Sequence, residues 1–144
     1  MILRGIEMSA IIEELKKKSS FYCEKGASIE EIEAAEKALG LRFSDEYREY
    51  LQLYGAVSCG GHELTGLSED VNLNVVNVTA VNRDKNPHVN ESLYVIEETH
   101  IDGIVIWQDE SGIIYQAEYQ AVPEKLYNSL TEFVDSFEAD SELS

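Results

Sequence analysis

Two helix signals that follow one another closely constrain the fold of this sequence more than any other feature. Ser28 and Glu31 form a capping box, in which the serine hydroxyl can accept from the amide of Glu31 while the glutamate accepts from the amide of the cap. Gly40 stands where a left-handed residue commonly ends a helix. The pattern predicts a helix over residues 28–40.

The second signal begins at Ser44, a favourable N-cap, and the helix is predicted to end at Gly55. Its larger side chains follow the i, i+3, i+4, i+7 spacing of an amphipathic helix; they are Tyr47, Tyr50, Leu51 and Tyr54. Residues 56–61 are predicted to form a turn-rich connection, and residues 62–67 a strand.

The ordered set of residues in this stretch resembles the SUKH superfamily, which includes fungal cell-wall-synthesis regulators and many bacterial immunity proteins. The residues that carry the resemblance are Ile32, Glu36, Leu39, Gly40, Tyr47, Leu51, Tyr54, Gly55 and Gly66. Ser44 occupies the cap where family members usually carry a proline. The motif is mainly structural, and in outline the resemblance extends from about residue 28 to about residue 137, so it implies a fold more directly than a function.

Helices are also predicted at both ends of the chain. Ser9 is the expected cap of the first, whose apolar side carries Ile11, Ile12 and Leu15, and residues 24–27 are a short link after it. Ser129 and Glu132 form a capping box for the last helix. The apolar face of this last helix consists of Leu130, Phe133, Val134 and Phe137.

Residues 71–81 are ambiguous, because valine and threonine favour a strand whereas Val71, Val75 and Val78 also fit one face of a helix. The SUKH resemblance implies a helix that ends near Arg83, and we adopt that prediction. Residues 83–88 are then expected to form an exposed loop.

Three strands are predicted over residues 93–98, 103–108 and 113–119, joined as an antiparallel meander. The middle strand is apolar on both faces, which is typical of a central strand covered on two sides. Pro123 breaks the pattern after the third strand. The fold class is therefore expected to be α+β, an antiparallel or mixed sheet flanked by N-terminal and C-terminal helices. We expect a single domain over residues 1–144, with frayed ends at 1–8 and 139–144.

The charge of the chain restricts its partners. With 28 acidic against 11 basic residues, the formal net charge is −17. Nucleic acid and anionic membrane surfaces would be repelled, whereas a basic protein would be attracted. Acidity that serves only solubility is the alternative. With no signal sequence, no apolar run long enough to span a bilayer and two cysteines without metal-site spacing, a cytoplasmic protein with free thiols is expected.

Catalytic patterns are weak. Cys59 and His62 have a spacing that a cysteine nucleophile and its base can adopt on a loop, but no further signature of a triad accompanies them, and a buried cysteine filler is the favoured interpretation. The histidines lack metal-ligand spacing, and the paired carboxylates are too numerous to be informative. We therefore predict no enzyme activity, no cofactor and no metal.

The resemblance implies an immunity protein that binds a cognate toxin, often a nuclease, and neutralises it by stoichiometric protein–protein inhibition. The alternative is a regulatory scaffold of the cell-wall-synthesis type. Charge clustered at predicted turns, together with one tyrosine that either contacts a partner or packs on the sheet, suggests the partner-binding residues. They are Glu69, Asp70, Asp102, Asp109, Glu110, Glu118 and Tyr119.

Overall fold

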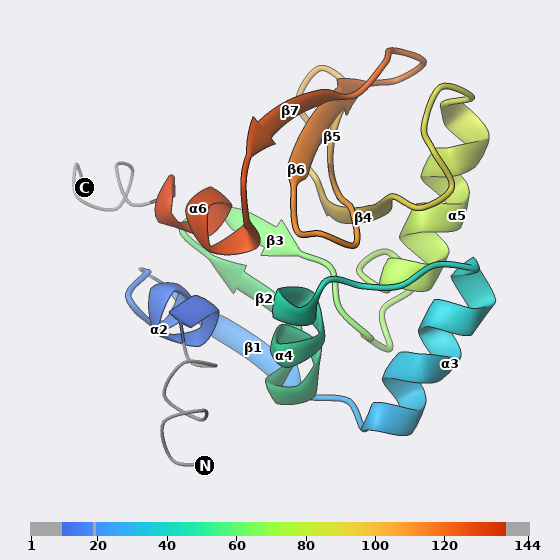
Figure 1. Cartoon of the computed structure of the whole chain (residues 1–144). Helices are drawn as coiled ribbons and strands as arrows, with labels where there is room; N and C mark the ends of the chain where they lie inside the picture. Colours follow the sequence, from blue (N-terminus) through green and yellow to red (C-terminus); the bar gives the residue numbers. More distant parts are fainter. Residues whose placement is uncertain (1–9, 19, 138–144) are drawn as a thin grey trace.

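The computed structural model describes residues 10–18 and 20–137 and shows the predicted α+β class, with helices beside two antiparallel sheets (Figure 1). The helices are α2 (Ala10–Lys16), α3 (Ile29–Leu39), α4 (Asp45–Leu53), α5 (Val75–Lys85) and α6 (Leu130–Asp135). The first sheet has the order β1 (Tyr22–Lys25), β2 (Tyr54–Cys59), β3 (His62–Leu64). The second has the order β4 (Tyr94–Glu98), β5 (Ile104–Gln108), β6 (Ile114–Glu118), β7 (Glu124–Tyr127).

The predicted caps of α3 and α4 are present. Ser28 and Glu31 make both hydrogen bonds of the capping box, at 3.1 and 2.8 Å, and Gly40 ends α3 in the left-handed region with a φ of 68°. The Ser44 hydroxyl accepts from the amide of Tyr47 at 3.0 Å. Local sequence therefore sets where both helices begin and where α3 ends.

The prediction that α4 runs to Gly55 and is followed by a turn-rich connection is wrong. Tyr54 is already extended, with φ −130° and ψ 151°, and residues 54–59 form strand β2. Gly55 lies within this strand, and another backbone segment crosses it closely there: a Cβ on Gly66 would lie 1.9 Å from the carbonyl oxygen of Gly55. The turn itself is limited to Gly60 and Gly61, which both have positive φ.

The ambiguous stretch is helical, as predicted, but the helix is displaced along the chain. The side chain of Asn74 caps α5 by accepting from the amides of Val76 and Asn77. The helix then continues to Lys85, so the prediction of an exposed loop over residues 83–88 is wrong for residues 83–85, whereas residues 86–88 lie outside regular structure. Arg83 donates to the carbonyl of Leu39 at 3.2 Å, and this contact holds α5 against the end of α3.

Two short strands were not predicted. Strand β1 occupies part of the expected link, and β7 follows Pro123. Both are four-residue edge strands without fully buried side chains, so they carry little of the alternation by which strands are identified. The three strands predicted as a meander are confirmed as β4, β5 and β6.

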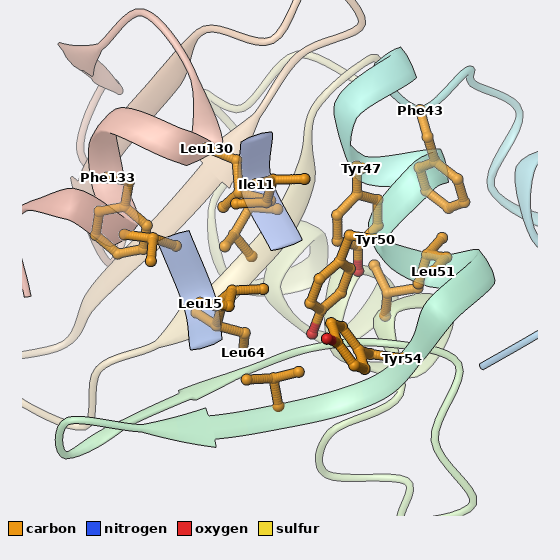
Figure 2. Close-up of a cluster of buried hydrophobic side chains, with 14 of the residues drawn as sticks. Ile11, Leu15, Phe43, Tyr47, Tyr50, Leu51, Tyr54, Leu64, Leu130 and Phe133 are labelled. Atoms are coloured by element: carbon orange, nitrogen blue, oxygen red, sulfur yellow. The ribbon is translucent and has the colours of Figure 1, made fainter. Parts of the chain in front are cut away.

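The second sheet is buried on both faces, as the apolar character of its central strand predicts. One face packs on Val78 of α5 through Val95, Val105 and Trp107. The other face belongs to the main core, which also takes side chains from the first sheet and from α2, α4 and α6. Figure 2 shows part of this core, with Ile11 and Leu15 of α2 close to Leu130 and Phe133 of α6.

Helices from the two ends of the described chain thus pack together. The predicted cap Ser9 and the expected frayed ends at 1–8 and 139–144 lie outside the described residues. None of the helices formed by the described residues has the length and apolar character that crossing a lipid bilayer requires.

Candidate functional site

Cys59, His62 and Glu97 lie together in a pattern that superficially resembles a catalytic triad. Cys59 and His62 are paired across the β2–β3 hairpin, and Nδ1 of His62 lies 3.0 and 3.2 Å from the two carboxylate oxygens of Glu97. However, Cys59 is only 1% exposed, and burial raises the pKa of its thiol to about 11. A neutral, enclosed thiol is a poor nucleophile, because the thiolate is the reactive form.

This cluster instead connects three elements. Glu97 also accepts from the amide of Glu63 at 3.1 Å, so one buried carboxylate joins β3 to β4. The ring of His62 stacks on Phe137 at 3.6 Å with an interplanar angle of 3°, just beyond α6. The geometry is that of a structural clamp. Among the described residues, no group of three or more histidine, cysteine, aspartate or glutamate side chains is arranged to hold a metal ion.

The seven predicted partner-binding residues lie in three separate places rather than on one surface. Asp102, Glu118 and Tyr119 gather at one end of the β5–β6 hairpin, and Asp109 and Glu110 lie at its other end. Glu69 and Asp70 belong to the loop between β3 and α5.

The first place is the end of the second sheet where the β4–β5 and β6–β7 connections meet, at the top of Figure 1. We call it the tip surface and define it by Ile101, Asp102, Glu118, Tyr119 and Val122. Ile101, Tyr119 and Val122 are 63%, 47% and 66% exposed, and Asp102 and Glu118 are also exposed. Apolar and acidic side chains therefore share one solvent-facing area.

The tip surface is held in one geometry by contacts beneath it. A Cβ on Gly103 would lie 3.0 Å from the Tyr119 ring, so the two connections touch, and the Lys85 ammonium of α5 lies 4.9 Å from the centre of that ring. The buried side chain of Asn86 donates to the carbonyls of Ala121 and Glu118, at 2.8 and 3.5 Å. The end of α5 thereby fixes the β6–β7 connection.

The backbone of these connections is unusual. His100, Asp102 and Gln120 have φ values of 60°, 54° and 68°, in the left-handed region that residues other than glycine seldom adopt. Such conformations cost energy and persist only where surrounding structure enforces them, which is often at functional sites. Three of them together at one end of the sheet single out the tip surface.

The second place is the β5–β6 turn, where Asp109 is committed to internal contacts. Its carboxylate accepts from the hydroxyls of Ser111 and Tyr115 at 2.8 and 2.9 Å, and from the amide of Ile113 at 3.0 Å. Burial opposes the charge, but these hydrogen bonds outweigh it and lower the pKa of Asp109. Glu110 is exposed and pairs with Arg42 at 3.5 Å.

The third place borders a depression on the first sheet, which we call the outer hollow, with a volume of about 630 Å³. The residues that line it are Tyr22, Cys23, Glu24, Lys25, Gly26, Ala27, Glu31, Leu67 and Glu69. Asp70 is exposed nearby, and its carboxylate caps the turn at Asn72. Strand β1 and the link from it to α3, which supply most of this lining, lie in the lower half of Figure 1, whereas the connections of the tip surface lie at its top.

The comparison with known families agrees with this architecture. Residues 8–138 match the SUKH family model described as SMI1-KNR4 cell-wall. The chain belongs to the SUKH family. Among curated proteins, no match was found.

The SUKH motif residues serve the fold. Ile32, Leu39, Tyr47, Leu51 and Tyr54 are buried in the main core, and Glu36 accepts from the amide of Phe43 at 2.9 Å, which fixes the link between α3 and α4. Gly40 ends α3, whereas Gly55 and Gly66 permit the close crossing of two backbone segments described above.

Sequence reasoning missed several residues of these surfaces. Ile101 and Val122 of the tip surface and Tyr22 of the outer hollow are among the most exposed large apolar side chains. A bulky apolar residue inside a predicted turn, as at Ile101, was a usable signal. Tyr22 carried no such signal, because its exposure depends on which face of an unpredicted strand it occupies.

Proposed function

We propose that this SUKH protein is an immunity protein of the bacterial type, which binds one cognate toxin in the cytoplasm and blocks it without catalysis. The observation that supports this proposal most directly is the tip surface, where Ile101, Tyr119 and Val122 are exposed beside Asp102 and Glu118. Large apolar side chains that are exposed together, with a polar rim, are typical of protein-binding surfaces.

Charge supports the same kind of partner. The net charge of −17 favours a basic protein and disfavours nucleic acid. A nuclease toxin carries basic surface because its substrate is a polyanion. Complementary fields accelerate the encounter of such a pair, and the apolar side chains then exclude water from the contact. An acidic protein seated on that basic surface would keep the substrate out.

Rigidity of the tip surface supports tight binding. Asn86 and Gly103 already hold the two connections together, so little conformational entropy remains to be lost on association. Glu69, Asp70, Asp109 and Glu110 remain predicted contacts. Of these, we expect Asp109 to contribute least, since its carboxylate is occupied within its own turn.

The test is a titration against the protein encoded by the neighbouring gene, at low and at moderate salt, together with an assay of that protein's toxic activity. We expect one-to-one binding, loss of the activity at equimolar ratio, and an association rate that falls as salt rises. Absence of binding at both salt concentrations would contradict the proposal.

A matched pair of variants locates the contact. Glu118→Lys and Glu110→Lys each reverse one exposed glutamate, the first in the tip surface and the second in the β5–β6 turn, so both change the net charge equally. We expect Glu118→Lys to slow association more than Glu110→Lys, because charge effects on association are strongest near the interface. Equal effects would contradict a contact centred on the tip surface.

A regulatory scaffold is the second candidate, and the description of the family as SMI1-KNR4 cell-wall favours it. Such a protein would bind cell-wall-synthesis or signalling proteins rather than a toxin. Co-purification from the native cell distinguishes the two. Recovery of wall-synthesis proteins without any toxin would favour the scaffold.

A further inference from the structure

The face of the first sheet that points away from the core is open to solvent. Tyr22 is paired with Ser58, and Ser58 is paired with Glu63, so these three residues form a row across β1, β2 and β3. Tyr22 is 65% exposed, Glu63 is exposed and Ser58 is half-buried. Their neighbours Val57 and Leu64 point into the core, as the alternation of a strand requires.

Tyr22 and Glu24 occupy the ridge between two depressions on this face. Both line the outer hollow, and both also line a smaller depression of about 150 Å³. That smaller depression continues over Glu63 and Leu73. The two depressions therefore adjoin on the open face, with the exposed ring of Tyr22 between them, and we call them together the groove.

Glu24 packs directly against Gly55, which leaves room for it because glycine has no side chain. A Cβ on Gly55 would lie 2.8 Å from Cβ of Glu24 and 3.1 Å from its carboxylate oxygen Oε1, so the glutamate rests directly on the glycine. The Glu24 side chain is half-buried, and within the described residues its carboxylate makes no ion pair or hydrogen bond.

The charges around the groove have one predominant sign. Of the residues that line the outer hollow, three are glutamates and one is a lysine. Glu31 is already occupied by its capping box, whereas Glu24 and Glu69 remain available, and Glu63 adds a carboxylate on the other side of Tyr22. A cation entering this groove would meet an aromatic face and at least one carboxylate.

We propose that this groove binds an extended basic segment of a partner protein, with one arginine or lysine stacked on Tyr22 and paired with Glu24. Aromatic rings attract cations through their faces, and carboxylates form strong charge-assisted hydrogen bonds with guanidinium and ammonium groups. An extended segment fits because β1 is the edge strand of its sheet, along which a peptide can lie.

This inference goes beyond toxin neutralisation, since either a toxin or a scaffold partner can carry such a segment. Strand β1, which lines the groove, and the connections that carry the tip surface lie in different parts of the molecule in Figure 1, so a basic segment in the groove leaves the tip surface accessible. The protein would therefore have two separate contact points, one dominated by apolar side chains and one by a cation.

A short synthetic peptide, acetyl-Gly-Arg-Ser-Arg-Gly-amide, tests the groove on the full-length protein without any knowledge of the natural partner. We expect it to perturb the backbone amide NMR signals of residues 22–27 and 67–69 in a saturable way. The same peptide with glutamine in place of both arginines should have no effect. Shifts that are spread over the acidic surface, or concentrated at residues 101–122, would overturn the proposal.

Cys23 provides a second readout in the unmodified protein, because it lines the outer hollow while Cys59 is enclosed. The arginine peptide should slow the alkylation of Cys23 by iodoacetamide, and the glutamine peptide should not. Equal alkylation rates with both peptides would contradict occupation of the hollow.

Variants with a matched control separate the groove from overall charge. Glu24→Gln and Tyr22→Ala should each weaken binding of the arginine peptide by about two- to fivefold, the ranges for a solvent-accessible ion pair and for an exposed cation–π contact. Glu118→Gln removes the same charge at the tip surface and should leave the affinity unchanged. If all three variants weaken binding equally, the peptide is held by net charge and the proposal fails.

A second copy of the chain is the competing occupant of the groove. In that case the protein would self-associate in analytical ultracentrifugation, and Tyr22→Ala would return it to a monomer. We expect the wild type and Tyr22→Ala to have the same sedimentation coefficient. This outcome concerns only the groove. Toxin binding through the tip surface is tested separately, by the titration against the neighbouring gene product.

Discussion

Tyrosines inside the core and tyrosines on the surface differ in what their rings and hydroxyls contact. Tyr47, Tyr50 and Tyr94 are at most 1% exposed, whereas Tyr22 and Tyr119 are 65% and 47% exposed. Figure 2 shows Tyr47 and Tyr50 on α4, facing into the core; their rings stack at 5.3 Å. The surface tyrosines instead border the groove and the tip surface.

Each buried hydroxyl is used inside the protein. The hydroxyls of Tyr47 and Tyr50 both reach Thr65, and Tyr94 donates to the side chain of Gln108 at 2.7 Å. Burial raises the pKa of all three phenols, so they remain neutral donors. Since a buried tyrosine needs such partners, these residues specify the arrangement of α4 against both sheets, and the exposed tyrosines remain available for other proteins.

The largest expected effect is on stability and comes from the core. Tyr50→Ala should lower the free energy of unfolding by roughly 3–5 kcal/mol, the range for truncating a buried aromatic side chain. Urea unfolding followed by circular dichroism measures it, and Tyr22→Ala is the matched control, with an expected change of about 0.5 kcal/mol or less. Similar losses in both variants would abolish the distinction between the two groups of tyrosines.

The next effect is on binding and comes from the tip surface. Tyr119→Ala should weaken the affinity for the neighbouring gene product by about tenfold, or ~1.4 kcal/mol, because large aromatic side chains often dominate interfaces. Calorimetric titration measures the affinity. Tyr119→Phe keeps the ring and should retain most of the binding. A full loss with phenylalanine would show that the hydroxyl, rather than the ring, makes the contact.

Local signals explain which elements were predictable. The caps at Ser28, Ser44 and Ser129 act within three or four residues, and the structure has all three. Strand β5 was recognisable because both of its faces are buried and its sequence is continuously apolar. The helical state of residues 75–81 was predicted correctly through the family resemblance, since the hydrophobic pattern of this stretch is ambiguous.

What could not be predicted depends on contacts between distant residues. Tyr54–Cys59 is a strand because Gly55 meets Gly66 and because β1 and β3 pair on either side, and no local pattern encodes those neighbours. Glu46 looked like an ordinary first-turn acid, yet its carboxylate accepts from the amides of Leu130 and Thr131 and so joins α4 to α6.

The predicted contact residues illustrate the same limit. Turn chemistry correctly suggested exposure for Asp102 and Glu110, and the predicted meander already implied that Glu118 and Tyr119 approach Asp102 while Asp109 lies at the far end of the hairpin. It gave no indication that Val122 is exposed at the same end of the sheet as Ile101. Exposure of a single residue is a local property, whereas a surface is assembled by the fold.

A smaller effect distinguishes the ring of a core tyrosine from its hydroxyl. Tyr50→Phe keeps the packing and removes only the hydrogen bond to the Thr65 carbonyl at 2.8 Å. That carbonyl still accepts from Tyr47 at 3.3 Å, so we expect a loss of about 1 kcal/mol, within the range for one buried hydrogen bond. Tyr22→Phe should cost nothing measurable in the same urea titration. A loss as large as that of Tyr50→Ala would mean that the hydroxyl contributes more to the core than the ring does.

The smallest expected effect is on stability and comes from a carboxylate, that of Asp109. Its hydrogen bonds lower its pKa in the folded state, so its contribution to stability is fully present above the ordinary carboxyl pKa of about 3.9 and is lost as the pH falls through the folded-state pKa. Asp109→Asn should therefore be less stable than the wild type at pH 7 by less than about 1 kcal/mol, because the site is partly open to solvent. The difference should shrink below about pH 4.

Urea titrations at pH 7 and pH 3 measure this difference, with Glu110→Gln as the control for removal of an exposed carboxylate from the same turn. If the Asp109→Asn deficit is the same at both pH values, the charge of Asp109 does not stabilise the turn. If Asp109→Asn is destabilised as expected but associates with the neighbouring gene product at the wild-type rate, Asp109 belongs with the buried tyrosines, whose polar atoms are used within the fold. A slower association would instead group it with Tyr119, as a residue that contacts the partner.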